Sequence, residues 1–106
     1  MKRIGRAKFN VGQLVHHKLF DYRGVIFDVD LDFQGSDDWY EHVAKSRPPK
    51  NQPWYHVLVH DGDKNTYVAE RNLEADTALT VIEHPLINEF FSGFENGVYI
   101  PIRSSN

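Results

Sequence analysis

The amino-acid sequence predicts a mainly β fold: a small antiparallel β-barrel with one short helical insertion and a C-terminal tail that is part helical and part extended. Two observations support this prediction. Short runs of β-branched and aromatic residues recur between clusters of turn residues, and no long helical pattern alternates with them as it would in a parallel α/β sheet. The clearest runs are residues 53–59 and 66–69, which the polar residues 60–65 join into a β-hairpin.

Two further strands are expected before that hairpin. Residues 9–19 should form a lead-in and a first strand, because their apolar side chains share one parity, with a bend at Gly12. Residues 20–22 make a turn, and residues 23–30 form the second strand. The residues expected on one face of this second strand are Val25, Phe27 and Val29.

Residues 31–53 carry no strand signal, and a connection of this length within a small domain should contain an element or a function. We expect a short helix over residues 37–45. Asp38 followed by Glu41 resembles a capping box, which is typical of a helix start.

The last third of the chain predicts a mixed tail. Residues 70–76 should form a turn and residues 78–82 a short strand, and residues 98–102 alternate as a strand does. Between them, residues 85–94 carry large apolar groups at helical spacing, namely Leu86, Ile87, Phe90, Phe91 and Phe94. These groups are too many to leave in water. We expect them to cover the barrel, to join a subunit contact or to contact a partner, in that order, with Phe90 and Phe91 as candidate partner-binding residues.

The strand over residues 53–59 has two different faces. The face with Tyr55, Val57 and Val59 is expected to line a single barrel core. The full set expected in that core is Val15, Val25, Phe27, Val57, Val59 and Val68.

Trp54 lies on the opposite face of this strand, and two arrangements are open for it. In one, the ring is partly exposed beside His56 as a flat platform for a base or a peptide side chain, so both residues are candidate partner-binding residues. In the other, it covers the open end of the barrel beneath the helix at residues 37–45. The sequence slightly favours the second arrangement.

Length and composition restrict the class of protein. A chain of 106 residues suits a single domain over residues 1–106. The absence of cysteine excludes disulfides, thiolate metal sites and cysteine nucleophiles. No apolar run approaches the ~18–20 residues that a membrane span needs. We therefore expect a soluble cytoplasmic protein.

The sequence lacks the motifs of common catalytic and cofactor sites, including the Walker loop, Gly-x-Gly-x-x-Gly and Gly-x-Ser-x-Gly. Acidic runs beginning at Asp28 and Asp61 mimic an EF-hand loop but lack its glycine and its final glutamate. His56 and His60 share a strand face but would lie about 13 Å apart at ~3.3 Å per residue. We therefore expect no enzymatic activity, no metal and no cofactor.

The net charge of −3 argues mildly against a dedicated nucleic-acid-binding protein, but the charges are segregated. Residues 1–27 hold six basic residues against one acidic residue, and residues 28–76 hold eleven acidic against five basic. Such segregation can form a basic patch, in which Lys8, Lys18 and Arg23 are the candidate DNA contacts together with one or two bases of the N-terminus. Alternatively, the first basic residues form a solvated tail.

Five segments of the chain, taken in order, resemble the HspQ family, also called YccV-like or hemimethylated-DNA-binding domains. The resemblance covers residues 7–76, and residues 77–106 match no pattern that can be carried over. The segments are Val11-Gly12-Gln13, His17, Tyr22-Arg23-Gly24-Val25, Pro53-Trp54-Tyr55-His56-Val57, and Tyr67-Val68-Ala69-Glu70 with Asn72-Leu73.

This resemblance implies an SH3-like β-barrel, no catalytic motif and self-association into small homo-oligomers. It also implies two functions, which are binding of hemimethylated double-stranded DNA and assistance to a Lon-type protease under heat shock. We expect a non-enzymatic DNA-binding protein, with an accessory role in Lon-type proteolysis as the alternative. The basic first third favours the first function; exposed aromatics, the acidic surface and the apolar tail favour the second.

Overall fold

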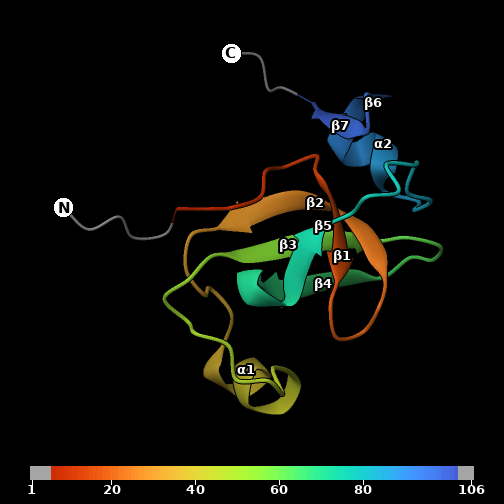
Figure 1. The fold of residues 1–106 in the computed structure, drawn as a ribbon. Helices are drawn as coiled ribbons and strands as arrows, with labels where there is room; N and C mark the ends of the chain where they lie inside the picture. The colour runs from red at the N-terminus through yellow and green to blue at the C-terminus, as the bar shows by residue number, and fades with distance from the viewer. Residues whose placement is uncertain (1–5, 103–106) are drawn as a thin grey trace.

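Five antiparallel strands form the main sheet of the protein, in the order β4-β3-β2-β1-β5 (Figure 1). The computed structural model describes residues 6–102. The strands are β1 (Leu14–His17), β2 (Arg23–Asp30), β3 (Trp54–Val59), β4 (Asn65–Ala69) and β5 (Leu73–Ala75). A mainly β antiparallel fold is therefore confirmed. The predicted closed barrel is not, because β4 and β5 are the two edges of the sheet and do not pair with each other.

A β-bulge in β2 changes which side chains share a face. Val25 lies opposite Leu58 and Ile26 opposite Val57, but the register then shifts and Asp28 lies opposite His56. The extra residue is Phe27, and beyond it the alternation of side chains is inverted. Val29 consequently packs with the core that contains Ile26, whereas Val25 and Phe27 pack on the other face. The prediction that all three share one face was wrong.

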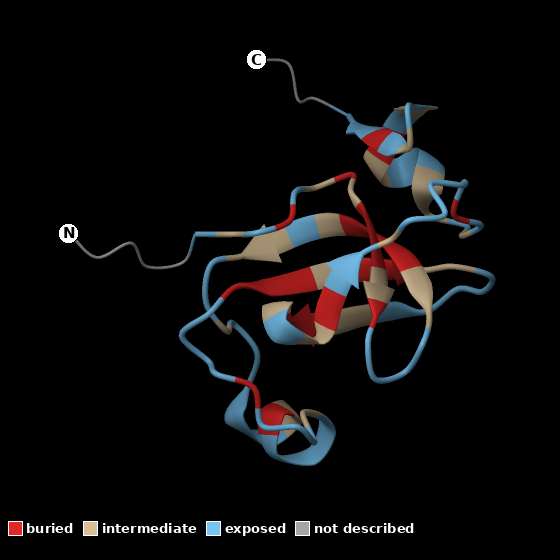
Figure 2. Ribbon diagram, viewed as in Figure 1, coloured by how far each residue is buried: buried red, intermediate tan, exposed pale blue. Residues whose placement is uncertain are grey.

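The sheet buries side chains on both of its faces. Buried residues occur along all of its strands (Figure 2). Val15, Val57 and Val68 lie together in the first core, as predicted. Val25 and Phe27 instead belong to a second core, on the face covered by the C-terminal segment. Val59 is only half-buried and belongs to neither core. The prediction of a single core failed because it treated one face of the sheet as open to solvent.

The C-terminal segment forms a helical turn and a hairpin that cover this second face. They are α2 (Ile87–Phe90), β6 (Phe91–Glu95) and β7 (Val98–Pro101), and residues 78–82 form no strand. The predicted helix over residues 85–94 is thus correct for only four residues. Asn96 and Gly97, both with positive φ, form the hairpin turn, as the Asn-Gly pair favours. Covering the sheet, the first of the three expected roles, is confirmed by the packing of Phe91 and Tyr99 against Leu14.

The short helix α1 (Asp37–Val43) is confirmed, although its cap differs from the prediction. Ser36, not Asp38, is the N-cap, and its hydroxyl accepts a hydrogen bond from the Trp39 N–H at 3.0 Å. Figure 1 shows α1 and the β6–β7 hairpin at opposite ends of the sheet. Among residues 6–102, no helix is both long and apolar enough to cross a membrane.

Candidate functional site

Two of the three predicted DNA contacts lie together at one end of the sheet. Lys8 and Lys18 are both exposed and line a hollow of about 200 Å³. Arg71, in the 3₁₀ helix η1 (Glu70–Asn72), lines the same hollow. The sequence prediction missed Arg71, because it lies in a mixed-charge turn and nothing in its spacing connects it to the N-terminal bases. We refer to the hollow that carries Lys8, Lys18 and Arg71, and that Glu70 also lines, as the basic hollow.

Lys8 is held in place by a hydrogen-bond network around Tyr55. The Tyr55 hydroxyl accepts hydrogen bonds from the backbone N–H groups of Lys8 at 3.1 Å and Phe9 at 3.2 Å, and donates one to the Glu70 carboxylate. Burial, with a contribution from Glu70, raises the pKa of Tyr55 to about 12, so the phenol stays protonated and remains a donor. The core thereby fixes the backbone that carries Lys8.

The other two members of the basic hollow are positioned by the backbone near η1. The Lys18 N–H donates to the Asn72 carbonyl oxygen at 2.8 Å, which ties the end of β1 to η1. The Arg71 guanidinium donates to the carbonyl oxygen of Ser46, in the segment after α1. Three segments far apart in the sequence therefore bring their cations to one place.

Arg23, the third predicted DNA contact, lies in an intramolecular ion pair instead. Its Nε is 2.8 Å from the Asp76 carboxylate, and its guanidinium also donates to the Thr80 carbonyl oxygen at 2.6 Å. The two side chains of the pair are 21% and 9% exposed. Arg23 is not among the residues that line the basic hollow. Of the N-terminal bases, Lys2 and Arg3 lie outside the described residues.

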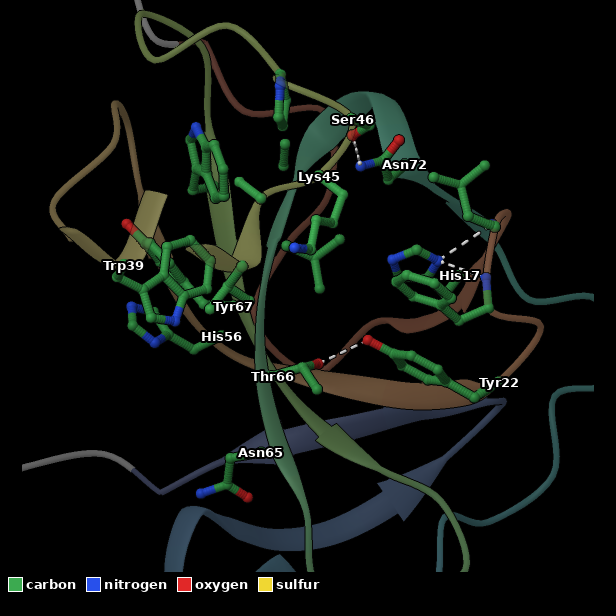
Figure 3. A pocket seen from close by; sticks show the side chains of 18 of the residues that line it. His17, Tyr22, Trp39, Lys45, Ser46, His56, Asn65, Thr66, Tyr67 and Asn72 are labelled. Carbon is green, nitrogen blue, oxygen red and sulfur yellow. Dashed lines mark hydrogen bonds between the residues drawn. The ribbon is translucent and has the colours of Figure 1, made fainter. Parts of the chain in front are cut away.

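A groove of about 660 Å³ follows the outer edge of β4 (Figure 3). Ala69 lines both this groove and the basic hollow, so the two adjoin. We call it the edge groove. One wall comes from the β1–β2 turn, with Phe20 and Tyr22, and the other from α1 and the residues after it, with Trp39 and Lys45. The groove is mostly aromatic and aliphatic, and none of its lining residues is acidic.

Trp54 adopts the covered arrangement, so the exposed platform is ruled out. Its side chain lies beneath α1 in a cluster with Tyr40 and is 1% exposed. The indole N–H donates to the Pro49 carbonyl oxygen at 3.1 Å. Trp39, which packs edge-on against Trp54 with ring centroids 6.0 Å apart, is half-buried and is the tryptophan nearer the surface.

The other predicted partner-binding residues also make intramolecular contacts. His56 is half-buried, and its Nε2 lies 3.1 Å from the carboxylate of Asp30, which also accepts a hydrogen bond from the Tyr67 hydroxyl at 2.7 Å. Phe91 is 2% exposed in the second core, and Phe90 is half-buried against Phe27, with centroids 4.7 Å apart.

The bulge in β2 also brings together three groups that could ligate a metal ion. Ligand atoms of Asp28, Asp30 and His56 all lie within 4.8 Å of one another. The sequence prediction of no metal site did not consider this set, because regular alternation would have placed Asp28 on the other face. The Asp30 carboxylate is already hydrogen-bonded to Tyr67, and this bond raises the pKa of the phenol further, after burial. The Asp30 carboxylate in this cluster therefore already has two protein partners, His56 and Tyr67.

A family model described as hemimethylated DNA-binding protein YccV like matches residues 7–98 of the chain. The match extends beyond the residues 7–76 on which the sequence resemblance rested. It includes α2, β6 and the first residue of β7, so the segment that covers the second face lies largely within the matched region. The chain belongs to the YccV-like family.

Proposed function

We propose that this protein binds double-stranded DNA through the basic hollow and performs no chemistry on it. The observation that carries this proposal is the convergence of Lys8, Lys18 and Arg71 from three segments onto one exposed surface of an otherwise acidic chain. The description of the family supports the choice of DNA over other anions. Lysine and arginine side chains that contact backbone phosphates supply the sequence-independent part of duplex binding.

Contacts to phosphates place a protein on DNA but read no sequence. Discrimination of a hemimethylated site needs an apolar or aromatic surface against the methyl group in addition to charge. Pro49, the exposed apolar residue that lines the basic hollow, is the surface that we propose for this contact.

The test is a salt-dependent titration of the full chain with hemimethylated and unmethylated duplexes of one sequence. The triple variant Lys8→Ala, Lys18→Ala, Arg71→Ala removes three cations from the DNA interface and should reduce the slope of log K against log salt by about 2.7. A slope difference of this size means that, between roughly 50 and 200 mM salt, the parent protein should lose about 40-fold more affinity than the triple variant. Lys64→Ala, at the exposed tip of the β3–β4 hairpin, is the control and should leave the slope unchanged.

Two results would contradict the proposal. One is an absence of duplex binding at low salt by the parent protein, and the other is an unchanged slope in the triple variant. Equal affinity for the two duplexes would retain the DNA proposal and remove the proposed reading of methylation.

A second candidate function is an accessory role in Lon-type proteolysis. The observation that favours it is the edge strand β4, whose outer side pairs with no strand within residues 6–102, beside exposed apolar side chains, Leu19 at 58% and Phe20 at 69% exposure. Stimulation of substrate degradation by a purified Lon-type protease, compared between the parent and a Phe20→Ser variant, tests it. Equal stimulation by both would place any protease contact elsewhere.

Self-association into a homo-oligomer stays a prediction, which sedimentation analysis can check.

A further inference from the structure

Strand β4 presents an unpaired row of backbone hydrogen-bonding groups to the edge groove. The Glu70 N–H donates to the Pro53 carbonyl oxygen and the Val59 N–H to the Lys64 carbonyl oxygen, both at 3.0 Å. In an antiparallel ladder, hydrogen-bonded pairs alternate with non-bonded pairs, so Thr66 and Val68 bond to β3. The N–H and C=O groups of the remaining residues therefore point outward. These residues are Asn65, Tyr67 and Ala69.

No strand within residues 6–102 pairs with this outer edge. Open edges usually carry a charge, a proline or a covering segment that prevents pairing with another chain. Here the side chains of β4 include no charge and no proline. Apolar groups flank the edge on both sides, with Phe20 on one wall and Val43, 53% exposed, on the other. An added strand could direct alternate side chains to these two walls.

A buried histidine supplies a donor in the same groove. His17 is 4% exposed, and its Nδ1 accepts hydrogen bonds from the N–H groups of Leu19 at 3.1 Å and Phe20 at 3.0 Å. Burial lowers the pKa of the His17 imidazole, which favours the neutral ring with its proton on Nε2. In Figure 3 this second nitrogen faces the groove, and no group in the described part of the chain accepts from it.

The charge of the groove selects among possible occupants. Lys45 lies on its wall, and none of the lining residues is acidic. An acidic side chain on the occupant could supply acceptors for both Lys45 and the His17 N–H. A second copy of this chain adding its own β4 would not do so, because Asn65–Ala69 contains no acidic residue. A nucleic acid would supply anionic phosphates but not the alternating backbone donors and acceptors that match an open strand edge.

We propose that the edge groove binds an extended peptide segment of a partner protein, which adds to the sheet as a strand beside β4. The segment carries apolar side chains for the two walls and an acidic side chain opposite Lys45 and His17. Backbone hydrogen bonds supply the affinity of such strand addition, and the side-chain positions supply its selectivity. This binding site is distinct from the basic hollow and stands whether or not the protein binds DNA or assists a protease.

The test uses a synthetic hexapeptide, capped at both ends, of alternating valine and threonine with a glutamate near its centre. We expect it to bind the full-length protein in calorimetry and to slow hydrogen exchange at the N–H groups of Tyr67 and Ala69 when measured by NMR. A matched peptide with glutamine in place of glutamate should bind about tenfold more weakly, the size of one charge-assisted hydrogen bond. A version methylated on every backbone nitrogen should not bind, because neither of its edges can donate to β4.

Among variants of the protein, Lys45→Glu should bind the glutamate peptide at least tenfold more weakly than the parent. Lys64→Glu makes the same charge change at the hairpin tip and should bind the peptide as the parent does. An absence of binding at millimolar peptide, binding that leaves Tyr67 and Ala69 unprotected, or full binding by the N-methylated peptide overturns the proposal. Two further results would assign the groove to another occupant and overturn it also. These are protection of both amides by self-association in the free protein, and displacement of the peptide by duplex DNA.

Discussion

The hydroxyl group of Tyr55 donates a hydrogen bond to the carboxylate of Glu70, and both groups also accept hydrogen bonds from the backbone N–H of Lys8. Lys8 and Glu70 are 62 residues apart in the sequence. A core residue of β3 therefore decides where a surface cation of the N-terminal segment lies. The candidate DNA contact depends on the interior of the fold, and the first prediction follows from that dependence.

Replacing Tyr55 by phenylalanine should destabilise the protein by about 2 kcal/mol, because the buried N–H of Phe9 loses its acceptor along with the Glu70 bond. Urea unfolding measures the loss, and faster hydrogen exchange at Lys8 and Phe9 should accompany it. Tyr22→Phe, which removes one hydroxyl bonded only to Thr66, is the control and should lose less. Equal stability of Tyr55→Phe and the parent would show that the network contributes nothing.

Replacing Arg23 by glutamine should destabilise the fold by about 2 kcal/mol, since Asp76 is only 9% exposed and would lose its partner. Asp76→Asn alone should destabilise the fold by a similar amount, and the double variant should be more stable than either single variant. The same Arg23→Gln variant should bind DNA with an unchanged salt slope. A smaller slope would mean that Arg23 contacts a phosphate after all.

Two neighbouring histidines should give stability opposite dependences on pH. Hydrogen bonds that His16 donates to Asp21 and to Glu74 raise the pKa of His16, whereas burial and then the charge of His16 lower the pKa of His17. His16 should therefore contribute to the free energy of unfolding below the unfolded pKa of about 6.5, and this contribution is lost as the pH rises through the higher folded pKa. His17 should contribute to the free energy of unfolding above the unfolded pKa of about 6.5, and this contribution is lost as the pH falls through the lower folded pKa.

Unfolding free energies measured between about pH 5 and pH 8 check these signs. His16→Gln should be less stable than the parent near the acidic end, and the difference should shrink toward the basic end. Asp21→Asn, which removes the principal partner of His16, should reproduce that trend in part. A His16→Gln penalty that grows with pH would contradict the assignment.

Local signals predicted those parts of the fold that short-range chemistry determines. The β3–β4 hairpin and β2 were predicted almost to the residue, because proline, turn residues and β-branched runs mark their limits. The bulge at Phe27 gives no such signal, and missing it reversed the faces of the residues around it. The Asn96-Gly97 turn did carry a signal, but the spacing of Phe90, Phe91 and Phe94 fits a helix as well as a hairpin.

The candidate site was predictable only in part for a related reason. The basic character of Lys8 and Lys18 is visible in the sequence, whereas their meeting with Arg71 depends on contacts between distant segments. Trp54 could be assigned to either of two environments, and only the position of α1 decides between them. The edge groove requires knowing which side of β4 is unpaired, which strand propensity alone does not reveal.

The final prediction concerns Phe91, which the sequence offered both as a cover for the sheet and as a partner contact. Because its ring is 2% exposed against Tyr99 and other residues of the second core, Phe91→Ala should destabilise the protein by about 3 kcal/mol. Phe90→Ala, at a half-buried position beside Phe27, is the matched control and should lose less. Urea unfolding separates the two variants. A Phe91→Ala protein as stable as the parent would mean that the hairpin does not cover the sheet, and would make Phe91 a candidate partner contact again.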